Sequence, residues 1–140
     1  MASKPFATGH CLCGAVSFTI NGSPVGNGQC HCKDCQRASG TGHMSIARFR
    51  RADVVMRGET SGYAVTAESG NTNTRYFCPK CGSRLFGENS AFPDLVNIAV
   101  GCVDDNNWFV PGRVVYAKDR PVWDVTSTQV PNFERMPPPA

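Results

Sequence analysis

The sequence predicts a mainly β fold with little helix, held together by bound metal. Short segments rich in β-branched and aromatic residues recur at intervals of about ten positions, which is typical of an all-β arrangement. Fourteen glycines and ten prolines provide the turns between such short elements. With 140 residues, 41% of them apolar, the chain has the size and composition of one folded globular unit. We therefore expect a single domain over residues 1–140.

The first predicted strand, residues 14–20, leaves a cysteine pair and ends in an Asn-Gly turn. A short helical turn is predicted at 34–38, because this stretch lacks the period of two that marks a strand. Strands 74–77 and 84–86 flank a CxxCG sequence and should form a zinc-knuckle hairpin. The chain should become irregular from about residue 131, where prolines accumulate. The remaining predicted strands are 44–49, 54–57, 63–66, 95–103 and 113–116.

The charge distribution argues against nucleic acid as a partner. The net charge is only +3, and lysines and arginines are scattered among acidic residues. The sequence has no apolar run near the roughly twenty residues that cross a bilayer, and residues 1–8 lack the apolar core of a secretory signal. We expect a cytoplasmic protein with no membrane partner.

Cysteine spacing is the most informative feature. Cytosolic thiols stay reduced, so a cysteine-rich cytosolic chain is more often metal-binding than disulfide-bonded. Seven of the eight cysteines form tight groups, namely Cys11 with Cys13, Cys30 with Cys32 and Cys35, and Cys78 with Cys81.

Two of these groups are complementary. Structural zinc takes four ligands in a tetrahedron, so the pair Cys78 and Cys81 needs two more, and Cys11 with Cys13 is the economical partner. Such a site can contribute on the order of 10 kcal/mol to folding. The alternative is that one pair is merely buried.

The remaining group, Cys30, Cys32 and Cys35, has an odd number of cysteines. Three protein ligands with a fourth position open to water or substrate distinguish catalytic zinc from structural zinc. Three thiolates on Zn²⁺ leave a net charge of about −1, which suits a thiol substrate better than water. A thiolate held there could attack a small electrophile such as an aldehyde. The alternative is that a fourth protein ligand closes the site of Cys30, Cys32 and Cys35.

The candidates for such a fourth ligand each have a simpler interpretation. His31 should point away from its neighbouring cysteines, because alternate side chains of an extended segment lie on opposite faces. Cys102 lies in the apolar stretch predicted as a strand, where a buried inert cysteine is usual. His43 could be a proton shuttle or a surface residue, and His10 is expected to have no role.

Arg37 is the candidate for holding a substrate carboxylate. It lies two positions after Cys35, and guanidinium groups bind carboxylates in a bidentate manner. The alternative is a solvated arginine.

The chain resembles the family of glutathione-dependent formaldehyde-activating enzymes, whose domain is shared with centromere protein V. The resemblance covers nearly the full chain and is specific, because seven cysteines match in order and spacing. The matching stretches are GHCLCGAV (9–16), CHCKDCQRASG (30–40), YFCPKCGSRLF (76–86), residues 111–123 and residues 133–137.

This resemblance implies an Mss4-like β fold with two zinc ions per chain. Structural zinc would lie at the positions of Cys11, Cys13, Cys78 and Cys81, and catalytic zinc at those of Cys30, Cys32 and Cys35. The implied activity is condensation of formaldehyde with glutathione, a carbon–sulfur lyase reaction. Two departures from the family pattern are Arg113, where a histidine is expected, and Cys102, which the pattern does not require.

We therefore expect a zinc-dependent lyase that adds a thiol, glutathione in the first instance, to a small carbonyl compound. Two alternatives remain open. The chain could be a non-enzymatic, zinc-stabilised binding module, or a lyase of the same fold that acts on another thiol conjugate.

Overall fold

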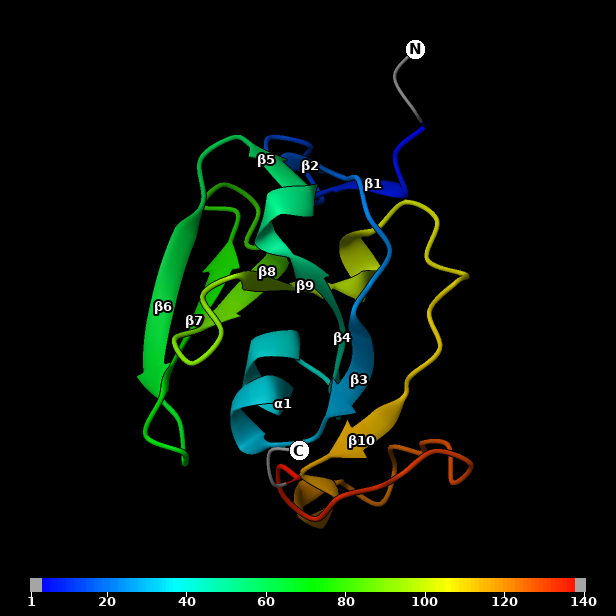
Figure 1. Ribbon diagram of the computed structural model, residues 1–140. Helices are drawn as coiled ribbons and strands as arrows, with labels where there is room; N and C mark the ends of the chain where they lie inside the picture. Colours follow the sequence, from blue (N-terminus) through cyan, green and yellow to red (C-terminus); the bar gives the residue numbers. More distant parts are fainter. Residues whose placement is uncertain (1–3, 138–140) are drawn as a thin grey trace.

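The computed structural model describes residues 4–137 and is built mainly from strands (Figure 1), as predicted. It contains one short α-helix, and three 3-10 turns lie at Arg51–Asp53, Val100–Cys102 and Ala117–Asp119. The strands are β1 (Ala7–His10), β2 (Ser17–Ile20), β3 (Gly26–Cys30), β4 (Met44–Arg50), β5 (Val54–Arg57), β6 (Ser61–Thr66), β7 (Thr72–Phe77), β8 (Arg84–Asn89), β9 (Leu95–Ala99) and β10 (Arg113–Val115), and the helix is α1 (Lys33–Ser39).

The strands form two sheets. Strands β1, β2 and β5 make a small antiparallel sheet, which lies at the top of the view in Figure 1. The large sheet has the order β10-β3-β4-β9-β8-β7-β6. Neighbouring strands of this sheet run antiparallel, except that β10 runs parallel to β3. This parallel pairing places Val115 of β10 beside Cys30, the first cysteine of the triplet.

The large sheet has one apolar and one polar face, because side chains alternate along each strand. Ala47, Phe49, Val96 and Ile98 point to one side and are almost completely buried in the main core. Phe18 of the small sheet packs into the same core. The intervening residues of the same strands point to the opposite side, where the candidate site is built.

Helix α1 covers one end of the polar face. Its Cys35 is buried with Met44 of β4 and Ala99 of β9. The helix begins after Cys32, whose sulfur accepts a hydrogen bond from the backbone N–H of Cys35 at 3.3 Å, and ends at Gly40, whose φ of 75° favours glycine. The predicted helical turn is confirmed and extends one residue further at each end. The rest of the polar face stays open.

Most predicted strands are confirmed with shifted ends, and 54–57 is reproduced without change. The prediction of a strand over 95–103 is wrong in its second half, because the chain leaves β9 after Ala99 and forms a 3-10 turn. Cys102 therefore lies in a turn and not in a strand. Strands β1 and β3 were not predicted, since neither has an apolar alternation.

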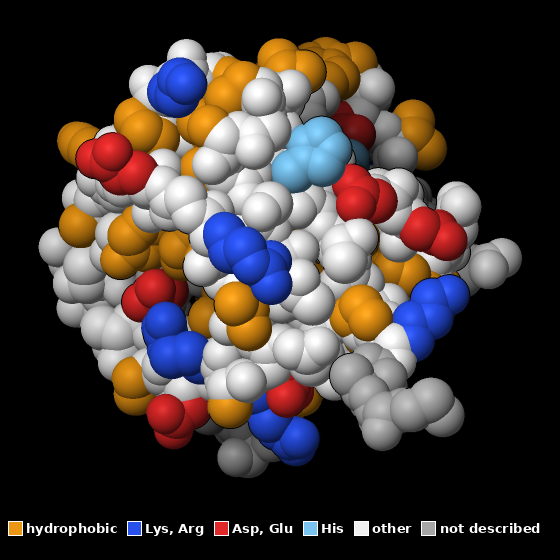
Figure 2. Space-filling model, turned by 90° about the horizontal axis from the view of Figure 1, so that it is seen from above, with side chains coloured by type: hydrophobic (Ala, Val, Ile, Leu, Met, Phe, Trp, Pro, Cys, Tyr) orange, Lys and Arg blue, Asp and Glu red, His pale blue; other side chains and the backbone are white. Residues whose placement is uncertain are grey.

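Two further observations bear on the sequence-based expectations. Among residues 4–137, no helix is both long and apolar enough to cross a membrane. Figure 2 views the end of the molecule that carries the small sheet, and basic and acidic side chains are interspersed on this face. The scattered charge seen in the sequence is thus also scattered in space on this side.

Candidate metal centres and the adjoining pocket

The four cysteines of the first and third groups lie together. Cys11 and Cys13 follow β1, Cys78 and Cys81 lie between β7 and β8, and their sulfurs are all within 4.8 Å of one another. The Cys11–Cys13 and Cys13–Cys78 sulfur distances are 3.7 and 3.8 Å. A tetrahedron with Zn–S bonds of about 2.3 Å has edges of about 3.8 Å. The sulfur set therefore fits a zinc ion.

Hydrogen bonds from the surrounding chain reach the sulfurs of Cys11, Cys78 and Cys81 in this cluster. The N–H groups of Val16 and Lys80 donate to the sulfurs of Cys11 and Cys78 at 3.3 and 3.4 Å. Hydrogen bonding, first from the Ser83 hydroxyl and then from its backbone, lowers the pKa of Cys81 to about 5. Both features stabilise the deprotonated sulfur that a metal requires.

The second group contains only three ligands. Cys30 ends β3, Cys32 caps α1 and Cys35 lies in its first turn, and their three sulfurs are within 4.8 Å of one another. No fourth histidine, cysteine, aspartate or glutamate among residues 4–137 joins this group. The donor set fits a zinc ion with one coordination position left for a ligand from outside the chain.

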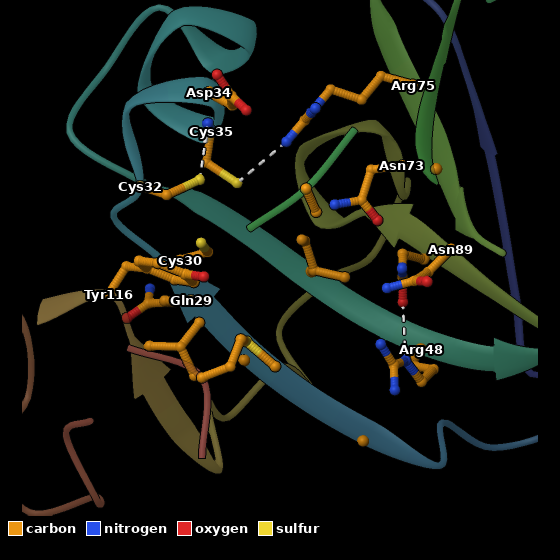
Figure 3. Close-up of a pocket in the computed structure, with 18 of the residues that line it drawn as sticks. Gln29, Cys30, Cys32, Asp34, Cys35, Arg48, Asn73, Arg75, Asn89 and Tyr116 are labelled. Carbon is orange, nitrogen blue, oxygen red and sulfur yellow. Dashed lines mark hydrogen bonds between the residues drawn. The ribbon is translucent and has the colours of Figure 1, made fainter. Parts of the chain in front are cut away.

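The pKa values of the three thiols are shifted in different directions. Hydrogen bonds from Cys30 and then Cys35 lower the pKa of Cys32 to about 2. The same contacts raise the pKa of Cys30. The guanidinium of Arg75 donates to the sulfur of Cys35 at 3.8 Å, from the opposite side of the pocket (Figure 3). A cation thus lies beside the sulfur triplet.

The triplet lies at one end of a pocket of about 950 Å³ that extends over the polar face of the large sheet. One row of paired residues crosses four neighbouring strands of this sheet. Its members, in order, are Arg75 of β7, Gly87 of β8, Asn97 of β9 and Arg48 of β4. Opposed residues share a face of a sheet, so these side chains line one continuous wall. Figure 3 shows Arg75, Asn73 and Asn89 along this wall, with Arg48 at its far end.

The pocket is rich in arginines without acidic partners. The lining has three acidic residues: Glu68 and Glu88 form ion pairs with Arg135 and Arg51, and Asp34 of α1 forms no salt bridge among the described residues. Within the described residues, no salt bridge reaches the other four arginines of the lining, which are Arg48, Arg75, Arg84 and Arg113. The pocket is therefore suited to an anionic ligand.

Arg84 is the most confined of these four. Its Nη1 is buried without a hydrogen-bond partner among residues 4–137. Burial, and then the neighbouring charge of Arg75, lower the pKa of Arg84 to about 10. A side chain at Gly87 would approach its Nη2 to 2.9 Å, so the glycine makes room for the guanidinium. An anion bound nearby would relieve this uncompensated charge.

Arg37, the sequence-based candidate for holding a substrate carboxylate, lies outside this pocket. Arg37 is exposed on α1 and does not line the pocket, whereas Cys35 is buried against the sheet. Residues two apart on a helix point in widely different directions, so nearness in sequence to Cys35 did not bring Arg37 to the same side. The arginines of the pocket come instead from strands distant in the sequence.

The predicted alternatives for a fourth ligand lie elsewhere. His31 is fully buried and its Nδ1 donates to the Gly42 carbonyl at 2.8 Å. The thiol of Cys102 donates to the Arg84 carbonyl at 3.0 Å. Nδ1 of His43 lies 2.7 Å from Asp124 Oδ2. None of these three candidates is part of the triplet. His10, for which no role was expected, is exposed on β1 and lies 3.7 Å from Asp104.

His31 and His43 share one carboxylate, which sequence reasoning missed. Asp124 Oδ2 lies 2.7 Å from Nδ1 of His43 and 3.3 Å from Nδ1 of His31. A side chain at Gly42 would overlap the Asp124 carboxylate. Because His31 stands between Cys30 and Cys32, this contact ties the late segment of the chain to the metal-binding loop. Nothing in the sequence near Asp124 indicated the partnership.

Comparison with known proteins gives concordant matches. Residues 6–119 match the family described as glutathione-dependent formaldehyde-activating enzyme. A relative from Halomonas elongata, whose name assigns it provisionally to that activity, is 30% identical over 121 residues, covering 82% of this chain and 77% of the relative. A provisionally named relative from Penicillium rubens is 29% identical over 105 residues, covering 73% of this chain and 54% of the relative.

A solved structure supports the fold. The crystal structure of a Rhodobacter sphaeroides protein superimposes with a TM-score of 0.58 and 21% identity, over 72% of this chain and 91% of that chain.

Proposed function

The chain belongs to the family of glutathione-dependent formaldehyde-activating enzymes, and from this premise we propose that it is a zinc-dependent carbon–sulfur lyase that adds a thiol to a small carbonyl compound. Glutathione is the proposed thiol and formaldehyde the first carbonyl to test. The observation that carries the proposal is the group of Cys30, Cys32 and Cys35, which has three sulfurs and opens onto a pocket rich in unpaired arginines.

The two cysteine clusters would have different tasks. Cys11, Cys13, Cys78 and Cys81 would hold a structural zinc, because all four positions of a tetrahedron are then filled by the chain. Cys30, Cys32 and Cys35 would hold the second zinc, which supplies an open position where a substrate thiol is kept deprotonated at neutral pH.

The chain's own residues supply electrostatics and orientation. Arg75, at 3.8 Å from Cys35 Sγ, offsets part of the negative charge of the three sulfurs. Arg84, buried beside it, adds a second positive charge at the same end of the pocket. Together these groups would attract an anionic thiol and hold it near the triplet.

The reaction balances without an oxidant or reductant. The substrate sulfur forms a bond to the carbonyl carbon, the carbon–oxygen double bond becomes a single bond, and the oxygen takes up the proton that the thiol has lost. The product of formaldehyde and glutathione is S-(hydroxymethyl)glutathione. The role of the protein is to bring the two reactants together and to keep the sulfur nucleophilic.

Exchange NMR with carbon-13 formaldehyde and glutathione tests the proposal. The wild-type chain with two zinc ions should accelerate exchange between free formaldehyde and the adduct, whereas Cys32→Ser should not exceed the spontaneous rate. If the fully zinc-loaded chain leaves the exchange rate unchanged, the proposed reaction is wrong.

A melting experiment separates the enzyme from a mere binding module. Glutathione at one hundred times its dissociation constant should stabilise the folded chain by about 2.7 kcal/mol. A module that does not bind the thiol would show no shift. A shift with a different thiol only would indicate a lyase of the same fold with another substrate.

A further inference from the structure

Strand β3 leaves a groove without side chains next to the cysteine triplet. Gly26, Gly28 and Cys30 alternate with residues of the other face, so all three point into the pocket. A Cβ atom at Gly26 would have no neighbour within 4 Å, and one at Gly28 would make only ordinary contacts with Arg113. The floor of the pocket beyond Cys30 is therefore bare backbone.

Two arginines flank this floor. Arg48 of β4 pairs in register with Gly26, and Arg113 of β10 pairs with Gly28. At about 3.3 Å per residue, Gly28, opposite Arg113, lies roughly 7 Å along β3 from Cys30, and Gly26, opposite Arg48, lies roughly 13 Å from it. A tripeptide-sized thiol that starts at the triplet and is up to about 10 Å long would therefore end between these two positions.

No acidic side chain between residues 4 and 137 forms an ion pair with either arginine of this pair. Arg48 donates to the neutral side chain of Asn97 at 2.9 Å and stacks over the Phe92 ring at 5.2 Å. Burial, and then the nearby charge of Arg113, lower the pKa of Arg48. Two like charges over an open floor favour an anion between them.

We propose that Arg48 and Arg113 form a carboxylate subsite that holds the end of the thiol substrate remote from its sulfur. The inference rests on the proposed function, since it concerns the thiol that this function requires. It makes the two arginines specificity-determining residues: they select thiols that carry a carboxylate several bonds from the sulfur. They are distinct from Arg75 and Arg84, which lie near the sulfur end.

Calorimetric titration with glutathione and with its diethyl ester tests the subsite. The ester keeps the thiol and loses both carboxylate charges. The wild-type chain should bind glutathione about ten to a hundred times more tightly than the ester, the range expected for hydrogen bonds between charged groups. Arg113→Gln and Arg48→Gln should each weaken binding of glutathione and leave binding of the ester unchanged. In these variants the ratio of the affinity for glutathione to the affinity for the ester should fall towards one.

Two further variants serve as controls. Arg113→Lys keeps the charge and should retain part of the preference for glutathione. This variant shows whether the effect of Arg113→Gln comes from the lost charge or from a changed structure of β10. Arg50→Gln lies on the same strand as Arg48 but is exposed and outside the pocket, so its preference should equal that of the wild-type chain. Equal affinity of the wild-type chain for glutathione and the ester would overturn the subsite, as would an undiminished preference in folded Arg113→Gln.

The outcome for the subsite is separable from the outcome for the reaction. If the preference and its loss in Arg113→Gln are seen but the chain does not accelerate thiol addition to formaldehyde, the subsite stands and the lyase activity is wrong. If both thiols are added with equal efficiency at low concentration, the lyase activity stands and the subsite is wrong.

Discussion

The guanidinium of Arg75 lies 3.8 Å from the sulfur of Cys35, although the two residues are forty positions apart in the chain. Arg75 comes from β7 and Cys35 from α1, so the contact spans the pocket between the sheet and the helix. Three thiolates on one divalent ion carry a net negative charge, and a cation at this distance lowers the cost of gathering them.

Substitution Arg75→Gln should therefore reduce kcat/KM for thiol addition by about tenfold, because one charge close to the reacting sulfur is lost. Arg75→Lys, which keeps the charge, should lose less. Zinc content measured on the same samples shows whether the metal is still present. Equal kcat/KM for Arg75→Gln and the wild-type chain at full zinc loading would contradict this role.

The two cysteine clusters should respond differently to substitution. Cys78→Ser removes one of the four ligands of the proposed structural zinc and should unfold the chain. Such a zinc ion contributes on the order of 10 kcal/mol to folding, whereas the whole free energy of unfolding of a domain is about 5–15 kcal/mol. Cys32→Ser should leave a folded chain with one zinc ion in place of two. Circular dichroism and elemental analysis check both results. A folded, zinc-replete Cys78→Ser chain would show that its cluster is not structural.

Gly9 should not tolerate a side chain. An added Cβ would overlap the Cys102 carbonyl oxygen and the buried ring of Phe18. We expect Gly9→Ala to lower the free energy of unfolding by about 1–3 kcal/mol, as overpacked cores do. Gly101→Ala is the matched control, because its Cβ would meet nothing within 4 Å. Urea titration of both variants measures the difference, and equal stability would refute the close packing at Gly9.

Asp124 should matter for stability, although it lies outside every cysteine group. Asp124→Asn removes the negative charge that faces His43 at 2.7 Å and His31 at 3.3 Å. We expect a loss of about 1–3 kcal/mol in the free energy of unfolding. The exposed Asp105, whose carboxylate accepts hydrogen bonds from the backbone and side chain of Asn107, supplies the control Asp105→Asn. If the two variants unfold at the same urea concentration, the contact between Asp124 and the histidines does not contribute to the free energy of unfolding.

The sequence was most informative where the signal is local. Strands β2, β4 and β5 have apolar and β-branched residues at alternating positions, so their burial could be predicted from short segments. The cysteine groups are likewise contiguous, and the number of ligands in each limited how they could combine. Strand β3, with the sequence GNGQC, has no such alternation and exists because β4 and β10 pair with it on both sides.

The pocket could not be predicted in this way. Its arginines come from separate strands, and only the register of the sheet places Arg48, Arg75 and Arg113 on one face. The choice of Arg37 relied on nearness in sequence to Cys35, whereas Arg37 lies on a part of α1 that does not line the pocket. The link from Asp124 to His43 spans 81 positions, so it too depends on tertiary structure.

The four-cysteine cluster also constrains how the chain can be made. Cys13 and Cys78 are 65 positions apart. At a synthesis rate of about 5–20 residues per second, the first pair of thiols leaves the ribosome roughly 3 to 13 seconds before the second pair. During that interval the nascent chain carries two reactive thiols whose partners have not yet been made. Binding of the proposed zinc ion at this cluster must therefore wait for the second pair, and oxidation of the first pair before then would prevent it.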